Sequence, residues 1–98
     1  MKPINPFVIF KAVETYLHIP AGSICSKKGS RTRSLARHVS VRLCRELTNY
    51  SFPELGEFYE RHHTTLIDAD QRAKKSPEAI RICKEIANII VQKEESEL

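Results

Sequence analysis

The stretch SFPELG at residues 51–56, followed after a short gap by RHHTT at residues 61–65, decides the fold. Ser51 and Glu54 have the spacing of a capping box, and Pro53 stands in the first turn, where its missing N–H costs nothing. The second stretch begins another helix with side chains that can donate and accept hydrogen bonds. Two such helices joined by a tight turn predict a helix-turn-helix over residues 51–75, a motif that places the start of its second helix in the DNA major groove.

The rest of the chain also has helical periodicity, and no segment carries an Asn-Gly or Asp-Gly hairpin signal. We therefore predict an all-α fold, a compact bundle of about five helices that forms one domain over residues 1–93. The expected helices cover residues 6–17, 33–48, 51–60, 62–75 and 77–93, with one further turn within 20–26, a basic loop over 27–33 and a fraying acidic tail over 94–98.

Positive charge is concentrated in residues 27–45, which contain no acid, whereas acids outnumber bases in residues 46–98. The bases of this segment are Lys27, Lys28, Arg31, Arg33, Arg37, Arg42 and Arg45. Such a run can be a solvated face, but Arg33 and Arg37 lie near a helix start, where cations oppose the helix dipole. The concentration of charge therefore favours a phosphate-binding surface.

Several classes of protein are excluded or disfavoured by the composition. With 98 residues the chain has room for one small domain. No apolar run approaches the roughly 20 residues of a membrane span, and the N-terminus lacks the apolar stretch of a signal peptide, so we expect a cytoplasmic, nucleoid-associated protein. Cys25, Cys44 and Cys83 are widely spaced, which predicts buried apolar side chains rather than a disulfide framework or a zinc site. We expect no metal, no cofactor and no enzymatic activity.

The candidate site begins at the tip of the second helix of the motif. Thr64 and Thr65 can bond a phosphate or a base edge and contact a thymine methyl. His63 can donate to a base acceptor, and Arg61 can bind a phosphate with two parallel hydrogen bonds. The alternative is that Thr64 only caps the helix and that the histidines are ordinary surface residues.

In order along the chain, these motifs resemble the C-terminal DNA-binding domain of the bacterial replication initiator DnaA. The resemblance covers about residues 5–75 and is carried by Val13-Glu14-Thr15-Tyr16 with Ile19, Ser26-Lys27-Lys28, Ser30-Arg31, Arg37, Arg45-Glu46-Leu47-Thr48-Asn49, residues 51–56, and residues 61–65 followed by Ala69. It implies a Trp-repressor-like fold and binding of double-stranded DNA at a short A·T-rich box such as TTATCCACA.

The resemblance also implies a role for each matching residue. Arg37 would reach the minor groove, where a guanidinium suits the negative potential of A·T-rich DNA. His63 and Thr64 would read bases in the major groove, and Thr65 would support them or hold a phosphate. Backbone and phosphate contacts would come from Lys27, Lys28, Arg31, Arg45, Ser51 and Pro53. From their own chemistry and position, we add His62 to the base-contacting candidates and Arg33 and Arg61 to the phosphate-contacting ones.

Two positions depart from the family pattern. His62 stands where the family has an aspartate, which can accept a hydrogen bond from a cytosine amino group. Glu60 alone takes the place of two glycines, so the turn is one residue shorter, and its carboxylate would repel a nearby phosphate. Both departures leave DNA binding expected and the preferred box open.

Three further hypotheses concern the role of the protein. No phosphate-binding loop of an ATPase is present, so we expect no ATP hydrolysis by this chain alone. We expect either a stand-alone DnaA-like protein or an excised domain, and favour a stand-alone protein that regulates replication in competition with the initiator or regulates transcription. A protein–protein adaptor with degenerate base reading is the alternative. The apolar helix over residues 77–93 (Ile80, Cys83, Ile86, Ala87, Ile90, with Ile82 and Ile89 beside them) is expected mainly to pack on the core, with a homodimer interface as the second interpretation.

Overall fold

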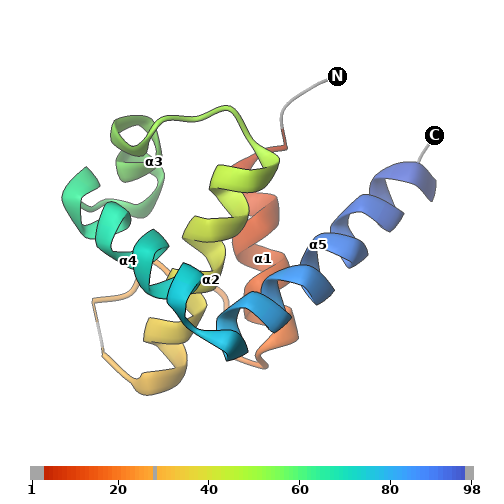
Figure 1. Ribbon diagram of the computed structural model, residues 1–98, viewed down its shortest axis with the longest axis horizontal. Helices are drawn as coiled ribbons and strands as arrows, with labels where there is room; N and C mark the ends of the chain where they lie inside the picture. The colour runs from red at the N-terminus through yellow and green to blue at the C-terminus, as the bar shows by residue number, and fades with distance from the viewer. Residues whose placement is uncertain (1–3, 28, 97–98) are drawn as a thin grey trace.

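The computed structural model describes residues 4–27 and 29–96 of the chain. This part contains five α-helices and no strand. They are α1 (Pro6–Tyr16), α2 (Arg31–Leu47), α3 (Phe52–Tyr59), α4 (His63–Lys75) and α5 (Pro77–Ser96), as Figure 1 shows. α2 lies at the centre and packs against α1, α4 and α5. The prediction of an all-helical bundle is confirmed. None of the helices in these ranges combines the length and the apolar character that crossing a membrane requires.

Short polar side chains fix where the helices begin. The Ser51 hydroxyl accepts a hydrogen bond from the Glu54 N–H (3.3 Å), and the Glu54 carboxylate accepts one from the Ser51 N–H (3.0 Å), so the predicted capping box is present. Ser76 accepts from the Ala79 N–H at the start of α5 (3.2 Å). These bonds satisfy N–H groups that have no partner within the first helical turn.

Three predicted boundaries are corrected. α2 begins at Arg31 because Ser30 is an N-cap that accepts from the Arg33 N–H (3.1 Å), so the expected loop over 27–33 is shorter. α4 begins at His63, with His62 as its N-cap. α5 continues to Ser96, so residues 94–96 of the expected acidic tail are helical.

The core forms around α2, with Val39 and Leu43 fully buried. On α5 the sequence periodicity misassigned two residues: Ile82, expected beside the buried stripe, is buried, whereas Ile80, expected within it, is 40% exposed. The three cysteines are free thiols; Cys44 and Cys83 are buried as expected, and Cys25 is partly buried. Burial raises the pKa of both buried thiols to about 12.

A polar contact fixes the orientation of α4 on the core. Asp70 of α4 is buried, and its carboxylate accepts a hydrogen bond from Arg42 of α2 at 2.8 Å. Burial alone would lower the pKa of Arg42, but the hydrogen bond that Arg42 donates to Glu46 and the charge of Asp70 outweigh it and raise that pKa. Because an unpaired buried charge is costly, this ion pair disfavours other placements of the helix.

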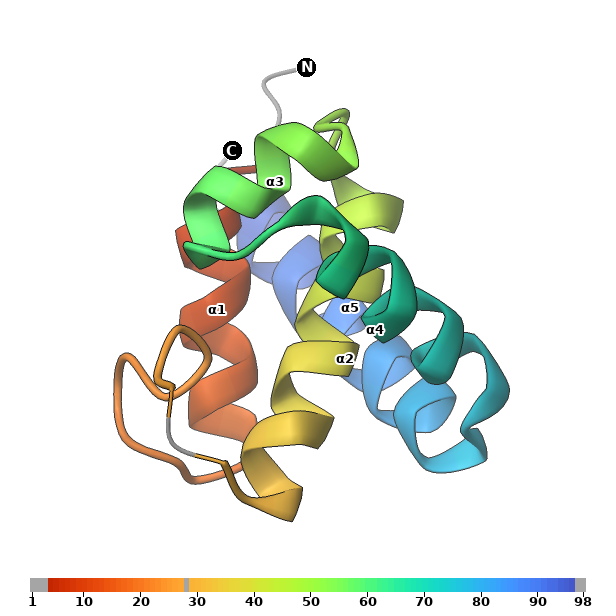
Figure 2. The same cartoon turned by 90° about the vertical axis from the view of Figure 1, so that its left-hand side faces the viewer.

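Gly56 allows the two helices of the helix-turn-helix to approach each other closely. A Cβ atom on Gly56 of α3 would lie 2.7 Å from the backbone oxygen of Arg61 and 3.5 Å from the backbone nitrogen of His63. The Gly56 carbonyl also accepts the Arg61 N–H at 3.0 Å. α3 and the start of α4 therefore lie as close as a residue without a side chain allows, an approach that Figure 2 shows.

Candidate nucleic-acid interface

The start of α4 is an exposed tip built from its own side chains. Nδ1 of His62 accepts a hydrogen bond from the Thr64 N–H (3.3 Å) and lies 2.8 Å from the Thr64 hydroxyl. The ring of His63 lies on that of His62, with 4.3 Å between centroids. His62, Thr64 and Thr65 are exposed, and His63 is partly buried. The alternative interpretation, in which Thr64 caps the helix, is wrong. His62 is the N-cap of α4, and both threonines are exposed.

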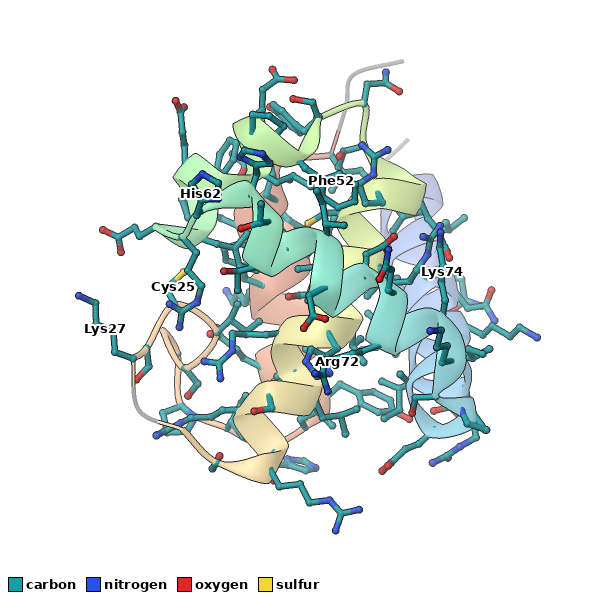
Figure 3. All side chains as sticks on the ribbon, turned by 60° about the vertical axis from the view of Figure 1, so that its left-hand side comes forward. Cys25, Lys27, Phe52, His62, Arg72 and Lys74 are labelled. Atoms are coloured by element: carbon teal, nitrogen blue, oxygen red, sulfur yellow. The ribbon has the colours of Figure 1, made fainter. Side chains whose placement is uncertain are left out.

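The loop before α2 is held against this tip. The carbonyl of Ser26 accepts hydrogen bonds from Arg37 of α2 (3.1 Å) and from Arg61 in the turn before α4 (2.7 Å). The Cys25 thiol donates to the Phe58 carbonyl of α3 (3.6 Å). Figure 3 shows Cys25 and Lys27 on the same side of the molecule as His62. Segments far apart in the sequence thus form one face.

Two guanidinium groups of this face, those of Arg61 and Arg33, lie close enough to Arg37 to act on it. Burial, followed by the positive charges of Arg61 and Arg33, lowers the pKa of Arg37. Because the charges of Arg61 and Arg33 both lower the pKa of Arg37, both guanidiniums lie near that of Arg37. The Ser26 carbonyl offsets part of this repulsion, but each guanidinium has five N–H donors, so a phosphate brought to this cluster would find donors to bind.

The basic segment carries further bases near the start of α2. Lys27 and Arg31 are exposed, and Arg33 is partly buried in the first turn of α2. The prediction for Lys28 lies outside the described residues. Since Arg31 and Arg33 are helical, their spacing is fixed by α2 rather than by a loose loop.

A second basic position lies at the start of α3. Arg45 donates to the Tyr50 carbonyl (2.8 Å), and its guanidinium carbon lies 4.4 Å from the centre of the Phe52 ring. Both contacts hold the exposed side chain beside the N-terminus of α3, where Ser51 and Pro53 are also exposed. The Ser51 N–H and hydroxyl donate to Glu54 and lower the pKa of that carboxyl. The first turn of α3 therefore carries an acid that takes both donors of Ser51, and Pro53 beside it has no N–H to donate.

The turn between α3 and α4 contains a strained acid. Glu60 has φ 55° and ψ 42°, the left-handed conformation that glycine adopts without cost. Its N–H bonds to the Glu57 carbonyl (3.3 Å), which closes α3. The short turn between α3 and α4 therefore depends on a glutamate in a backbone conformation that favours glycine.

Replacing Glu60 by glycine is expected to raise the free energy of unfolding by about 1 kcal/mol, because the left-handed strain is removed. It should also strengthen DNA binding, because a negative charge leaves the face. Urea unfolding and DNA titration would measure the two effects. Glu57→Gly removes the same charge inside α3 and should destabilise the protein; equal effects of the two variants would contradict this interpretation.

Comparison with known proteins now adds to this geometry. Residues 6–73 match the family model described as the bacterial DnaA protein helix-turn-helix. The chain belongs to the bacterial DnaA helix-turn-helix family. The match runs from the start of α1 into α4 and includes the loop, the arginine cluster and the tip. The resemblance inferred from the sequence is confirmed, and the family is one of DNA-binding domains.

Relatives of this DnaA-like domain are named chromosomal replication initiator protein DnaA. The protein of Methylobacillus flagellatus is 48% identical over 62 residues, which are 62% of this chain and 13% of that protein. The protein of Dechloromonas aromatica is 45% identical over 62 residues, and that of Tropheryma whipplei 35% over 69 residues, again 13% and 14% of their lengths. The chain thus corresponds to a small part of these relatives.

Two parts of the site were not anticipated from the sequence. The Ser26 carbonyl has no sequence signal, because any residue carries one. Glu14 is buried on α1, and its carboxylate accepts two backbone N–H groups of the loop. Its position one turn after Phe10 could have indicated an inward-facing acid. In the described residues no group of three or more His, Cys, Asp or Glu side chains is arranged to hold a metal ion.

Proposed function

We propose that this DnaA-like domain binds double-stranded DNA with the tip of α4 in the major groove. The observation that carries the proposal is the pair of hydrogen bonds from Arg37 and Arg61 to the Ser26 carbonyl. They hold the basic segment beside the tip, so one duplex can meet both. The family membership supports the same function.

The proposed roles follow from exposure and chemistry. His63, Thr64 and Thr65 read base edges, with His62 beside them as the cap of the helix. Arg37 enters the adjacent minor groove. Lys27, Arg31, Arg33 and Arg61 bind phosphates between the two grooves, and the same role is proposed for Lys28, which lies outside the described residues. Arg45 binds a phosphate at the start of α3, where Ser51 and Pro53 contact the DNA backbone.

The proposed target is an A·T-rich site related to the DnaA box. Occupation of such sites would regulate replication initiation or transcription in the cytoplasm, in competition with an initiator that binds the same boxes. No chemistry on the DNA is proposed, since the contacts of this face are suited to binding alone.

Fluorescence anisotropy with boxed and scrambled duplexes tests the proposal. The boxed duplex should bind more tightly, and affinity for both should fall steeply with salt because several phosphates are neutralised. Thr64→Ala should cost about 1–2 kcal/mol on the box and reduce the preference for it, whereas Lys27→Ala should weaken both duplexes alike. Equal affinity of the native protein for the two duplexes at moderate salt would contradict sequence-specific binding.

His62→Asp is expected to change which base pair is preferred. Aspartate is a stronger N-cap than histidine and accepts a hydrogen bond from a cytosine amino group. The variant should gain about 0.5–1 kcal/mol of stability and bind better to a box with cytosine at the facing position. Titration of duplexes with all four base pairs at each position would measure this. An unchanged preference would show that residue 62 has no part in base reading.

A second candidate function is that of an adaptor or homodimer, favoured by the exposed apolar side chains of α5. Ile80, Ile89 and Val91 are 40–43% exposed. Sedimentation equilibrium for the oligomeric state, together with the duplex titrations, distinguishes the two candidates. A stable oligomer with weak affinity for every duplex would favour the adaptor, and a monomer that prefers boxed DNA would exclude it.

A further inference from the structure

Glu14 is a buried acid that takes no part in the proposed contacts with DNA. It lies on α1 with 7% of its surface exposed. One of its oxygens, Oε2, accepts hydrogen bonds from the Gly22 N–H (3.0 Å) and the Ile24 N–H (3.2 Å). Charge-assisted hydrogen bonds of this kind are stronger than neutral ones, and they join α1 to the loop that precedes the basic segment.

The loop depends on this carboxylate for its shape. Gly22 has φ 89°, which glycine tolerates, and Ile24 is fully buried in the core. Between them the Ser23 N–H bonds to the Pro20 carbonyl (3.1 Å), and the Ser26 N–H then bonds to the Ser23 carbonyl (3.2 Å). The two bonds to Glu14 thus fix the turn that leads directly to Ser26.

Ser26 connects this turn to the proposed interface. Its carbonyl accepts from both Arg37 and Arg61. If the turn moves, that oxygen moves with it, and the two guanidiniums lose the acceptor that holds them together. Their mutual repulsion, which contributes to the lowered pKa of Arg37, then favours separation of the groups.

We infer that Glu14 is a positioning residue for DNA binding: its carboxylate holds the 22–26 turn so that the Ser26 carbonyl sets Arg37 and Arg61 side by side. The inference rests on the proposed function. Glu14 itself touches no DNA, and its effect passes through the backbone of the turn to the two arginines.

The test compares Glu14→Leu, which has no acceptor, with Glu14→Gln, whose amide oxygen can take the place of Oε2. Glu85→Gln on exposed α5 is the control for the lost charge, since it changes the net charge equally. Binding of a boxed and a scrambled duplex is measured for each folded variant, together with hydrogen exchange at the Gly22 and Ile24 amides without DNA.

Glu14→Leu should bind the box about tenfold more weakly than Glu85→Gln, because both hydrogen bonds to the carboxylate are lost and part of that loss reaches the two arginines. Its preference for the box should fall, and exchange at Ile24 should be faster. Glu14→Gln should stay within about threefold of the control, because a neutral hydrogen bond remains. A folded Glu14→Leu that binds like the control would overturn the inference.

Two further outcomes are decisive. If Glu14→Leu does not fold, Glu14→Ala, which also lacks the acceptor but adds no bulk, takes its place: faster Ile24 exchange together with box binding about tenfold weaker than in Glu85→Gln would support the positioning role, and box binding equal to that of Glu85→Gln would overturn it. If the native protein shows no preference for the box, the proposed function fails. Amide exchange in the variants still tells whether the carboxylate holds the turn.

Discussion

Replacing Gly56 by alanine is expected to lower the free energy of unfolding by about 2–3 kcal/mol. In an open helix the same change would stabilise the protein by about 1 kcal/mol, because alanine has the higher helix propensity. Here the new Cβ would lie 2.7 Å from the Arg61 carbonyl oxygen. This atom belongs to the backbone, so the turn must shift, and the tip of α4 shifts with it. Urea unfolding measures the first effect and titration of a boxed duplex the second.

Gly29→Ala provides the control for this prediction. A Cβ on Gly29 would meet nothing within 4 Å, and the residue precedes the cap of α2. Its replacement should change stability by no more than about 0.5 kcal/mol. If Gly56→Ala proves as stable as Gly29→Ala, α3 and α4 do not approach as closely as described.

Arg37→Ala is expected to weaken binding to an A·T-rich box by about 2–3 kcal/mol, or roughly 30- to 150-fold. The side chain has two uses: its guanidinium is proposed to enter the minor groove, and it donates to the Ser26 carbonyl. Arg37→Lys should restore little of the affinity, because an ammonium lacks the planar fork of donors. Anisotropy at constant salt measures both variants.

Arg81→Ala removes an equal charge from the exposed surface of α5 and serves as the control. It should reduce affinity for boxed and scrambled duplexes slightly and equally. A loss in Arg37→Ala no larger than in Arg81→Ala would mean that Arg37 contributes only net charge. Full recovery by Arg37→Lys would lead to the same conclusion.

The elements that the sequence predicted well are those with local signals. The capping box of Ser51 and Glu54 formed as expected, because it depends on residues within one helical turn. Ser30 is a cap of the same kind, but its signal is weaker because bases, and no acid, stand in the first turn of α2. His62 was not expected as a cap because imidazole caps are uncommon.

The contacts that the sequence did not predict join distant segments. The Arg42–Asp70 pair connects α2 with α4, and Glu14 bonds to the loop through two backbone groups. An amphipathic pattern can indicate that an acid lies on an inward face, but it cannot name the partner. The candidate site was therefore predicted as a set of residues, and the way its two halves are held together required the structure.

Amide shift mapping of the ¹⁵N-labelled protein with a boxed duplex tests the central claim most directly. The face described here predicts that residues 61–65 at the tip of α4 and residues 26–37 of the basic segment shift together at the same DNA concentrations, with α5 unaffected. Shifts confined to α5, or shifts of only one of the two segments at saturation, would contradict a single interface that spans both.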